Sequence, residues 1–287
     1  MQPQQIQCAD GQPLSVHCYP STQQPSRGAV LLAPALGVPQ RFYRAFATHL
    51  ASQGYQVISV DYRGIGDSPL QVAADVDVRM SDWGTQDLPA ALGYLKSQAQ
   101  GQRCHVIGHS CGGQLLGLSQ ALDGIASITC IGSSVPYWRY YGRKQWKMWL
   151  FWHLLLPLLS QGQRFPAQQV GLSKQSLPVG IIRQWARWGR SKDYLFDPRN
   201  GFDLSGYHAY QGPLLNIGFV DDDYAPPAAV ADLAQRYSQA RHSERIWQWD
   251  EVKAVGGIGH FNYFRPSHQA HWGEISQWLH RHGANAA

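Results

Sequence analysis

The sequence is short of cysteine, of charge and of long apolar runs. Its five cysteines are odd in number and widely spaced, and no C-x-x-C pair occurs, so a disulfide framework and a cysteine-held metal site are both disfavoured. No stretch reaches the roughly 18 apolar residues that a membrane span needs, and the first ten residues lack the basic start and apolar run of a signal peptide. We therefore expect a globular, cytoplasmic protein that uses no metal and no cofactor.

Acidic residues are missing from one long stretch of the chain. Between Gly124 and Lys192 there is no Asp or Glu, but there are ten basic residues and six of the eleven tryptophans. The remainder carries 14 basic and 19 acidic residues, so the formal net charge of +5 arises in this stretch. Such a shift in composition indicates an inserted subdomain. We predict a helical lid at residues 134–206 and the core of the protein at residues 1–133 and 207–287.

Short apolar runs alternate with helical patterns over most of the chain. The predicted strands are Ile6–Cys8, Leu14–Tyr19, Ala29–Ala33, Gln56–Asp61, Arg103–Gly108, Ser127–Ile131, Leu214–Phe219 and Ile246–Val252. The predicted helices are Phe42–Gln53, Asp87–Gln98, Gln114–Leu122, Ala228–Gln239 and Gln269–Arg281. This alternation favours a mostly parallel sheet with helices on both faces, which binds ligands at the carboxyl ends of its strands.

The predicted lid contains two helical patterns of its own. The first is built from apolar and aromatic residues at helical spacing and is ended or kinked by Pro157; its members are Trp146, Trp149, Leu150, His153 and Leu154. The second, Val179–Gly189, separates arginines on one face from isoleucine and tryptophan on another. We expect this helical layer to cover the carboxyl ends of the strands.

A G-x-S-x-G turn, Gly108-His109-Ser110-Cys111-Gly112, lies between a predicted strand and a predicted helix. In that setting a sharp turn raises the serine hydroxyl above the sheet. The flanking glycines are expected because a side chain at either position would collide with the neighbouring strand or helix. Ser110 is therefore the candidate nucleophile. We interpret His109 as a structural histidine and expect the Cys111 side chain to point away into the packing.

A serine nucleophile needs a base to accept its proton and an acid to orient that base. His260 is the candidate base, because it follows the last predicted strand in the glycine-rich run Gly256–Phe261. Three consecutive aspartates follow the preceding strand, and Asp222 is the preferred acid with Asp221 as a close alternative. The resulting chain order of Ser110, Asp222 and His260 is typical of α/β-hydrolases.

The oxyanion that develops on the substrate needs two N–H donors. The backbone of Cys111 is one candidate, because it follows the nucleophile at the start of a helix. The loop after Ala29–Ala33 should supply the other. Pro34 has no N–H to donate, and Leu36 lies in the middle of the turn, so we predict Leu36.

Further motifs resemble those of α/β-hydrolases over nearly the whole chain. Residues 61–68, Asp-Tyr-Arg-Gly-Ile-Gly-Asp-Ser, are similar to the D-x-R-G-x-G-x-S turn of that superfamily, and Gly259-His260-Phe261 is similar to its histidine loop. Three segments resemble a little-characterised bacterial family related to serine aminopeptidase-like and monoacylglycerol-lipase-like enzymes: residues 39–43, 81–84 and 194–197. The usual His-Gly of the oxyanion loop is replaced by Pro34-Ala35. The resemblance implies an α/β-hydrolase fold, an eight-stranded sheet and a triad.

These residues predict a serine hydrolase that cleaves a carboxylic ester through an acyl-enzyme, with Ser110, His260 and Asp222 as its triad. Hydrolysis of an amide or thioester, or transfer of the acyl group, would use the same side chains. A hydrolase fold kept as a binding module without turnover is the alternative of a different class. The sequence does not determine the acyl substrate or the oligomeric state.

The basic, tryptophan-rich stretch has three interpretations. Its Trp and Leu residues can pack the lid while Lys and Arg solvate its outer face. The lid can instead contact an anionic membrane, because interfacial aromatics are combined with cations there. A positive field that attracts an anionic substrate is the third interpretation. Nucleic acid is not an expected partner, since no motif beyond the charge supports it.

Overall fold

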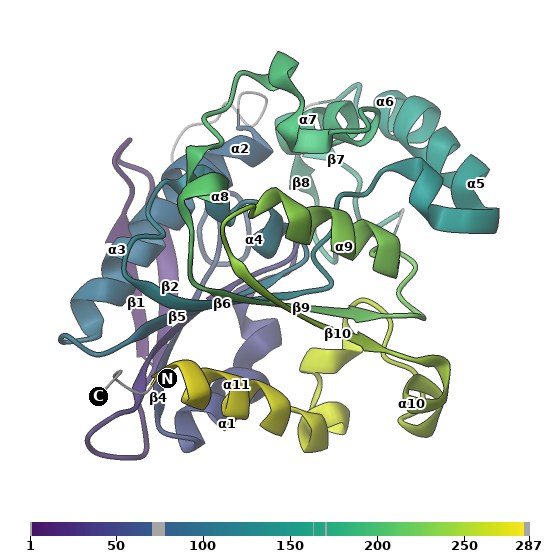
Figure 1. Ribbon diagram of the computed structural model, residues 1–287. Helices are drawn as coiled ribbons and strands as arrows, with labels where there is room; N and C mark the ends of the chain where they lie inside the picture. The colour runs from purple at the N-terminus through teal and green to yellow at the C-terminus, as the bar shows by residue number, and fades with distance from the viewer. Residues whose placement is uncertain (1, 71–77, 163, 170, 284–287) are drawn as a thin grey trace.

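One eight-stranded sheet forms the centre of the protein (Figure 1). A computed structural model describes residues 2–70, 78–162, 164–169 and 171–283. The strand order is β1-β2-β4-β3-β5-β6-β9-β10; β2 is antiparallel to both neighbours, and every pair from β4 to β10 is parallel. The strands are β1 Gln2–Gln7, β2 Pro13–Tyr19, β3 Gly28–Ala33, β4 Tyr55–Val60, β5 Cys104–His109, β6 Ile125–Ile131, β9 Pro213–Phe219 and β10 Arg241–Trp247. The predicted mostly parallel α/β sheet is confirmed.

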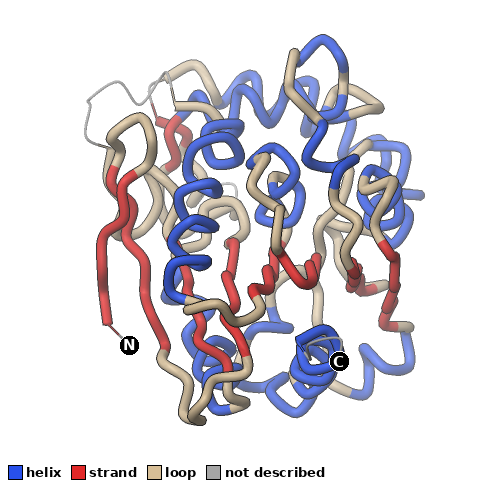
Figure 2. Tube along the Cα trace, turned by 60° about the vertical axis from the view of Figure 1, so that its left-hand side comes forward, coloured by secondary structure: helices blue, strands red, loops and turns tan. Residues whose placement is uncertain are grey.

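Helices cover both faces of this sheet (Figure 2). On one face Phe46 of α1 and Ile275 of α11 belong to one buried cluster, and on the other Leu92 of α3 and Leu115 belong to a second. The central strands β3, β5 and β9 are buried along their whole length, because a strand covered on both faces has no solvent-facing side chains. The helices are α1 Arg44–Ser52, α2 Met80–Asp82, α3 Leu88–Gln98, α4 Cys111–Gln114, α5 Gln145–Leu150, α6 Leu156–Leu159, α7 Val179–Gly189, α8 Ser205–Ala209, α9 Pro227–Arg236, α10 Trp249–Ala254 and α11 Gly273–Gly283.

The helix predicted at Gln114–Leu122 is wrong, because the α-helix after the nucleophile is only the four residues of α4. In a longer α-helix the carbonyl of Gln114 would accept the N–H of the residue four positions later. Here it accepts a hydrogen bond from the hydroxyl of Tyr207 at 2.5 Å. The N–H of Leu118 donates instead to a carbonyl three residues back. Residues Leu116–Ser119 are therefore a 3₁₀ turn.

The last strand was also predicted in the wrong place. It occupies Arg241–Trp247 rather than Ile246–Val252, and Trp249–Ala254 is a helix. The strand lies at the edge of the sheet and its first four residues are exposed, so it has no apolar run to mark it. A reciprocal capping box between Gln248 and Glu251 starts the helix.

Between β6 and β9 the chain leaves the sheet and forms a separate group of helices (Figure 1). Its short strands β7 Arg164–Phe165 and β8 Leu177–Pro178 pair with each other. The predicted helix Val179–Gly189 is confirmed as α7. Of the two alternatives for Pro157, the helix is not ended, since α6 continues to Leu159, but it is distorted by a π-helical turn at Phe151–Leu155 directly before the proline. Within the described residues, no helix is long and apolar enough to cross a membrane.

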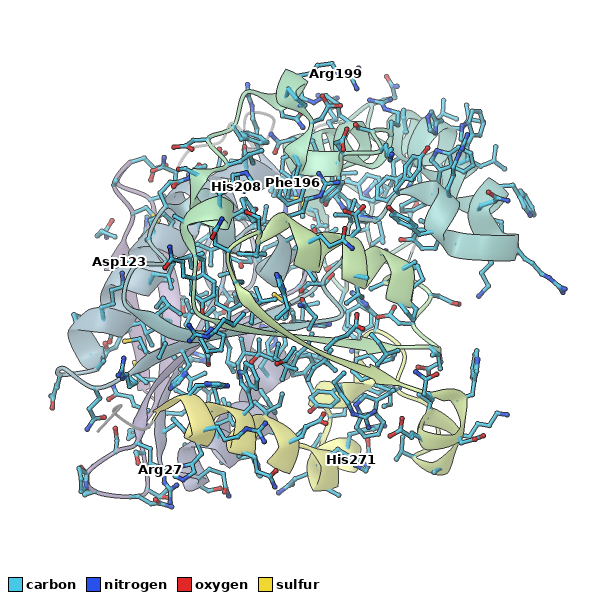
Figure 3. The ribbon with its side chains drawn as sticks, in the orientation of Figure 1. Arg27, Asp123, Phe196, Arg199, His208 and His271 are labelled. Carbon is cyan, nitrogen blue, oxygen red and sulfur yellow. The ribbon has the colours of Figure 1, made fainter. Side chains whose placement is uncertain are left out.

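The far end of this helical group packs on the core (Figure 3). The ring of Phe196 lies 4.8 Å from that of Tyr207 in α8, and the guanidinium of Arg236 in α9 lies 4.9 Å over it. Arg27 and His271 mark the opposite side of the sheet in the same view. The returning chain is thus fixed to the face of the sheet that carries α8 and α9.

Candidate active site

Ser110 lies in a strained turn between β5 and α4. Its backbone has φ 54° and ψ −120°, a region that a non-glycine residue adopts only when its surroundings enforce it. A Cβ on Gly108 would stand 2.5 Å from the Gly113 backbone, and one on Gly112 would stand 2.1 Å from the Ala33 carbonyl oxygen. The predicted reason for these glycines is confirmed. The close approach of α4 to β3 and β5 holds the Ser110 backbone in this conformation.

The two predicted oxyanion donors lie beside Ser110. Cys111 and Leu36 line the same cavity as Ser110. In the described part of the chain neither backbone N–H donates to a protein acceptor, since Cys111 is the first residue of α4 and has no acceptor within the helix. Ala35, by contrast, donates its N–H to the Tyr43 hydroxyl at 2.9 Å. Of the N–H groups of Ala35 and Leu36, that of Leu36 is the one without a protein acceptor in the described chain.

The thiol of Cys111 is withdrawn from the site. Its Sγ lies 3.5 Å from the carbonyl oxygen of Pro34 and the residue is buried. Burial raises the pKa of this thiol far above its ordinary value, so the nucleophilic thiolate is strongly disfavoured. The expectation that this side chain packs inward is confirmed.

His260 is hydrogen-bonded to Asp222. The Nδ1–H group donates to Asp222 Oδ2 at 2.7 Å, and both residues are buried. The other oxygen of Asp222 accepts the N–H groups of Tyr224 at 2.7 Å and Ala225 at 3.0 Å. His260 and Ser110 line one cavity. Within the described residues the Ser110 hydroxyl has no hydrogen-bond partner, so the structure joins the candidate base to the candidate acid but not the candidate nucleophile to the base.

Asp221 has a different set of partners. Its Oδ2 accepts the N–H groups of Ile258 at 2.8 Å and Gly259 at 2.9 Å. These amides belong to the loop that ends at His260. Asp221 therefore holds the histidine loop against the end of β9, whereas Asp222 contacts the imidazole itself.

Gly132 makes room for the hydrogen-bonded side chains of Asp222 and His260. It follows β6 with φ +59°, and a Cβ there would lie 3.3 Å from both Asp222 Oδ2 and His260 Nδ1. Its N–H donates to the carbonyl of Ile217 in β9. A side chain at this position would be strained and would press on the hydrogen bond between Asp222 and His260.

His109 joins three loops of the site through neutral hydrogen bonds. Burial is the main cause that lowers the pKa of His109 well below its usual value, and the nearby His260 lowers it further. The neutral ring donates from Nε2 to the backbone carbonyl of His260 at 2.7 Å and accepts at Nδ1 from the Tyr43 hydroxyl at 2.8 Å. Tyr43 in turn accepts the Ala35 N–H. Nucleophile turn, histidine loop and oxyanion loop are thus tied by one buried chain.

The turn at residues 61–68 holds the segment that follows the oxyanion loop. Asp61 accepts the backbone N–H of Gln40 at 2.6 Å and that of Asp67 at 2.9 Å. Arg63 pairs at 2.6 Å with the buried Asp87, and burial still raises the pKa of Asp87 to about 6. None of these groups lines the cavity over Ser110.

A cavity of about 340 Å³ opens over Ser110, within the usual size of a small-molecule site. Its walls are mostly apolar and come from the core and from the inserted helices; Leu36, Met80, Met148, Phe151, Trp152 and Trp185 are among them. Lys144 and Lys147 also line it, and Lys144 pairs at 2.5 Å with Asp223. Across the described chain no group of three His, Cys, Asp or Glu side chains could hold a metal ion.

Comparison with known proteins agrees with this architecture. A family model described as serine aminopeptidase, S33, matches residues 21–158. An esterase from Pyrococcus furiosus has a TM-score of 0.63 at 16% identity, over 99% of this chain and 91% of that one. An esterase from Exiguobacterium antarcticum has a TM-score of 0.62 at 16% identity, over 97% and 99%. The chain has the α/β-hydrolase fold.

One curated relative is similar over a shorter stretch. A protein of Variovorax paradoxus, whose assigned activity is that of the carbamate hydrolase RutD, is 32% identical over 103 residues. The match covers 36% of each chain, so this chain matches about a third of that relative's length. The structural likeness at 16% identity shows the fold and leaves the substrate open.

Sequence reasoning missed several residues that shape the candidate site. Tyr43 lies in the segment 39–43 that resembles related proteins, but its partner His109 is 66 residues away. Gly132 directly follows a predicted strand, which is a signal for a special backbone conformation. The pairing of Lys144 with Asp223 had no signal in the sequence, because it joins the inserted helices to the loop after β9.

Proposed function

We propose that this chain is a serine hydrolase that cleaves a carboxylic ester, with Ser110 as nucleophile, His260 as general base and Asp222 as the acid that orients it. The observation that carries the proposal is the buried hydrogen bond between His260 Nδ1 and Asp222. It lies at a cavity that also exposes a serine in a strained turn. Nucleophile, base and orienting acid on three different loops are the parts that acyl transfer needs.

The proposed reaction has two halves. His260 Nε2 accepts the proton of Ser110 as Oγ bonds to the carbonyl carbon, and the N–H groups of Cys111 and Leu36 receive the oxyanion. The C–O bond to the leaving alcohol then breaks, and His260 returns the proton to that alcohol. In the second half, water gives a proton to His260 and attacks the acyl carbon. Ser110 leaves with that proton, and the carboxylic acid is released.

The lining of the cavity supports an apolar acyl group rather than a peptide with a free amino end. Met148, Phe151 and Trp152 form one wall. Among the described residues that line the cavity, Asp223 is the one carboxylate, and Lys144 already pairs with it. An α-ammonium group of a peptide would find no free counter-charge there, so an ester fits better than an aminopeptidase substrate.

The inserted helices support a lid. Residues 134–206 contribute both apolar wall and lysines to the cavity over Ser110, so we infer that they cover the site while residues 1–133 and 207–287 form the core. A cytoplasmic location is inferred from the five cysteines, which are all unpaired and buried. Amide or thioester hydrolysis and acyl transfer remain chemically open to the same triad.

Labelling with a fluorophosphonate probe tests the function directly. The wild-type protein should be labelled and Ser110→Ala should not, because the probe reacts with an activated serine hydroxyl. A panel of nitrophenyl esters of increasing chain length should then show which acyl groups the cavity accepts. If the wild-type protein takes no label between pH 6 and 9, the chain is a hydrolase fold without turnover.

A further inference from the structure

The helices beside the cavity carry a concentrated apolar surface on their outer side. In the described part of the chain eight large apolar side chains are exposed, and six of them lie between residues 146 and 158. We call this set the α5–α6 face; its members are Trp146, Trp149, Leu150, Leu154, Leu155 and Leu158. Trp146 is 58% exposed and Leu158 is 67% exposed. Exposed apolar side chains concentrated in one short segment mark a candidate interaction surface.

The same stretch of helix is apolar on its inner side as well. Trp152 and Leu156 are buried in the core cluster, and Met148 and Phe151 line the cavity over Ser110. The inner side of the helix is therefore packed against the rest of the protein, whereas the α5–α6 face is exposed. Figure 3 shows side chains of α5 extending away from the rest of the protein.

Basic side chains lie beside tryptophans in α5 and in the turn that precedes it. The Nζ of Lys147 lies 5.5 Å over the ring of Trp146, and the guanidinium of Arg139 lies 5.0 Å over Trp138. Within the described residues, Arg139, Arg143 and Lys147 have no carboxylate partner. Because no Asp or Glu occurs from 124 to 192, every charged side chain that this stretch itself contributes is basic. Tryptophans that can lie at the membrane–water interface, with basic side chains beside them, are typical of a helix that lies on a membrane.

We propose that the α5–α6 face docks this protein on an anionic phospholipid surface. Trp and Leu would enter the interface while Arg and Lys contact the head groups. A second copy of the chain fits less well, since a symmetric dimer would place two positive faces against each other. Docking would also place against the lipid the helix whose inner side forms the cavity wall at Met148 and Phe151. The proposal concerns binding and stands whether or not Ser110 turns over an ester.

Co-sedimentation of full-length Ser110→Ala protein with phosphatidylcholine vesicles, with and without 30% phosphatidylglycerol, tests the docking. We expect binding to the anionic vesicles that weakens as salt rises, and a blue shift of tryptophan emission. Trp146→Ala/Trp149→Ala should reduce the binding at least tenfold. Arg139→Gln and Arg143→Gln should each reduce it about fivefold. These four side chains are outside the core, so the melting temperature should change little.

Helix α10 offers matched controls, since it carries an exposed Trp249 (55%) and an exposed Lys253. Trp249→Ala and Lys253→Gln should leave vesicle binding unchanged. Equal binding of the wild-type protein to neutral and anionic vesicles would overturn the proposal, as would equal losses in the α10 variants. A wild-type dimer that Trp146→Ala/Trp149→Ala converts to a monomer, without vesicle binding, would assign the face to a second copy instead. If the tryptophan variants do not fold, the salt dependence and the arginine variants still decide.

Discussion

Replacing Asp222 by Asn should abolish nearly all activity while leaving the site intact. One carboxylate oxygen of Asp222 accepts two backbone N–H groups, from Tyr224 and Ala225, and the other accepts Nδ1–H of His260. In Asp222→Asn the amide oxygen must stay with the two N–H groups, so the NH₂ group faces His260. The ring then has to accept at Nδ1 and carry its proton on Nε2, where it cannot take the proton of Ser110.

The size of the effect follows from that tautomer. Losing the correct tautomer in a Ser-His-Asp triad costs about 10⁴ in kcat, or roughly 5 kcal/mol of transition-state stabilisation. The neighbouring Asp221→Asn is the matched control. Its amide oxygen can still accept the N–H groups of Ile258 and Gly259, so we expect less than a tenfold loss.

Steady-state kinetics with a nitrophenyl ester, together with the urea midpoint of each variant, measures both effects. The Asp222→Asn loss should appear in kcat with a nearly unchanged KM and an unchanged urea midpoint. Activity of Asp222→Asn within tenfold of wild type would refute the reasoning. A larger loss in Asp221→Asn than in Asp222→Asn would show that the acid has been assigned to the wrong aspartate.

Three further substitutions test other parts of the structure. Tyr43→Phe leaves the Ala35 N–H and His109 Nδ1 without partners, so kcat should fall about 10- to 100-fold with KM nearly unchanged; a fall in urea midpoint alone would indicate a purely structural role. Gly112→Ala puts a Cβ 2.1 Å from a β3 carbonyl and should cost about 3 kcal/mol of stability in urea unfolding, whereas an unchanged midpoint would contradict this geometry. Burial lowers the pKa of His105 to about 4. The unfolded chain therefore binds more protons between pH 4 and 6.5, and the folded state loses about 2–3 kcal/mol as pH falls from 7 to 4.5; in His105→Gln this loss should be smaller, and an identical pH dependence in urea would refute the assignment.

Much of the core could be read from the sequence because its cause is local. Buried parallel strands such as β3 and β5 are continuous apolar runs, and the elbow glycines are required by backbone approach at their own positions. The edge strand β10 could not be found in this way, because its side chains face solvent. The early end of α4 could not be found either, because the hydroxyl of a tyrosine 93 residues away donates to the carbonyl that the next helical turn would have used.

The sequence by itself determined the fold class and the serine turn, and it predicted the order of the proposed nucleophile, acid and base, since these depend on periodicity and on motifs within a few residues. It left Asp221 and Asp222 unresolved, because both follow β9 and spacing alone cannot show which carboxylate contacts His260. Only the tertiary structure decided that contact, the chain from Ala35 through Tyr43 and His109, and the outward direction of the α5–α6 face. Each of these depends on which distant segments pack together, and that is set by the burial of the whole chain.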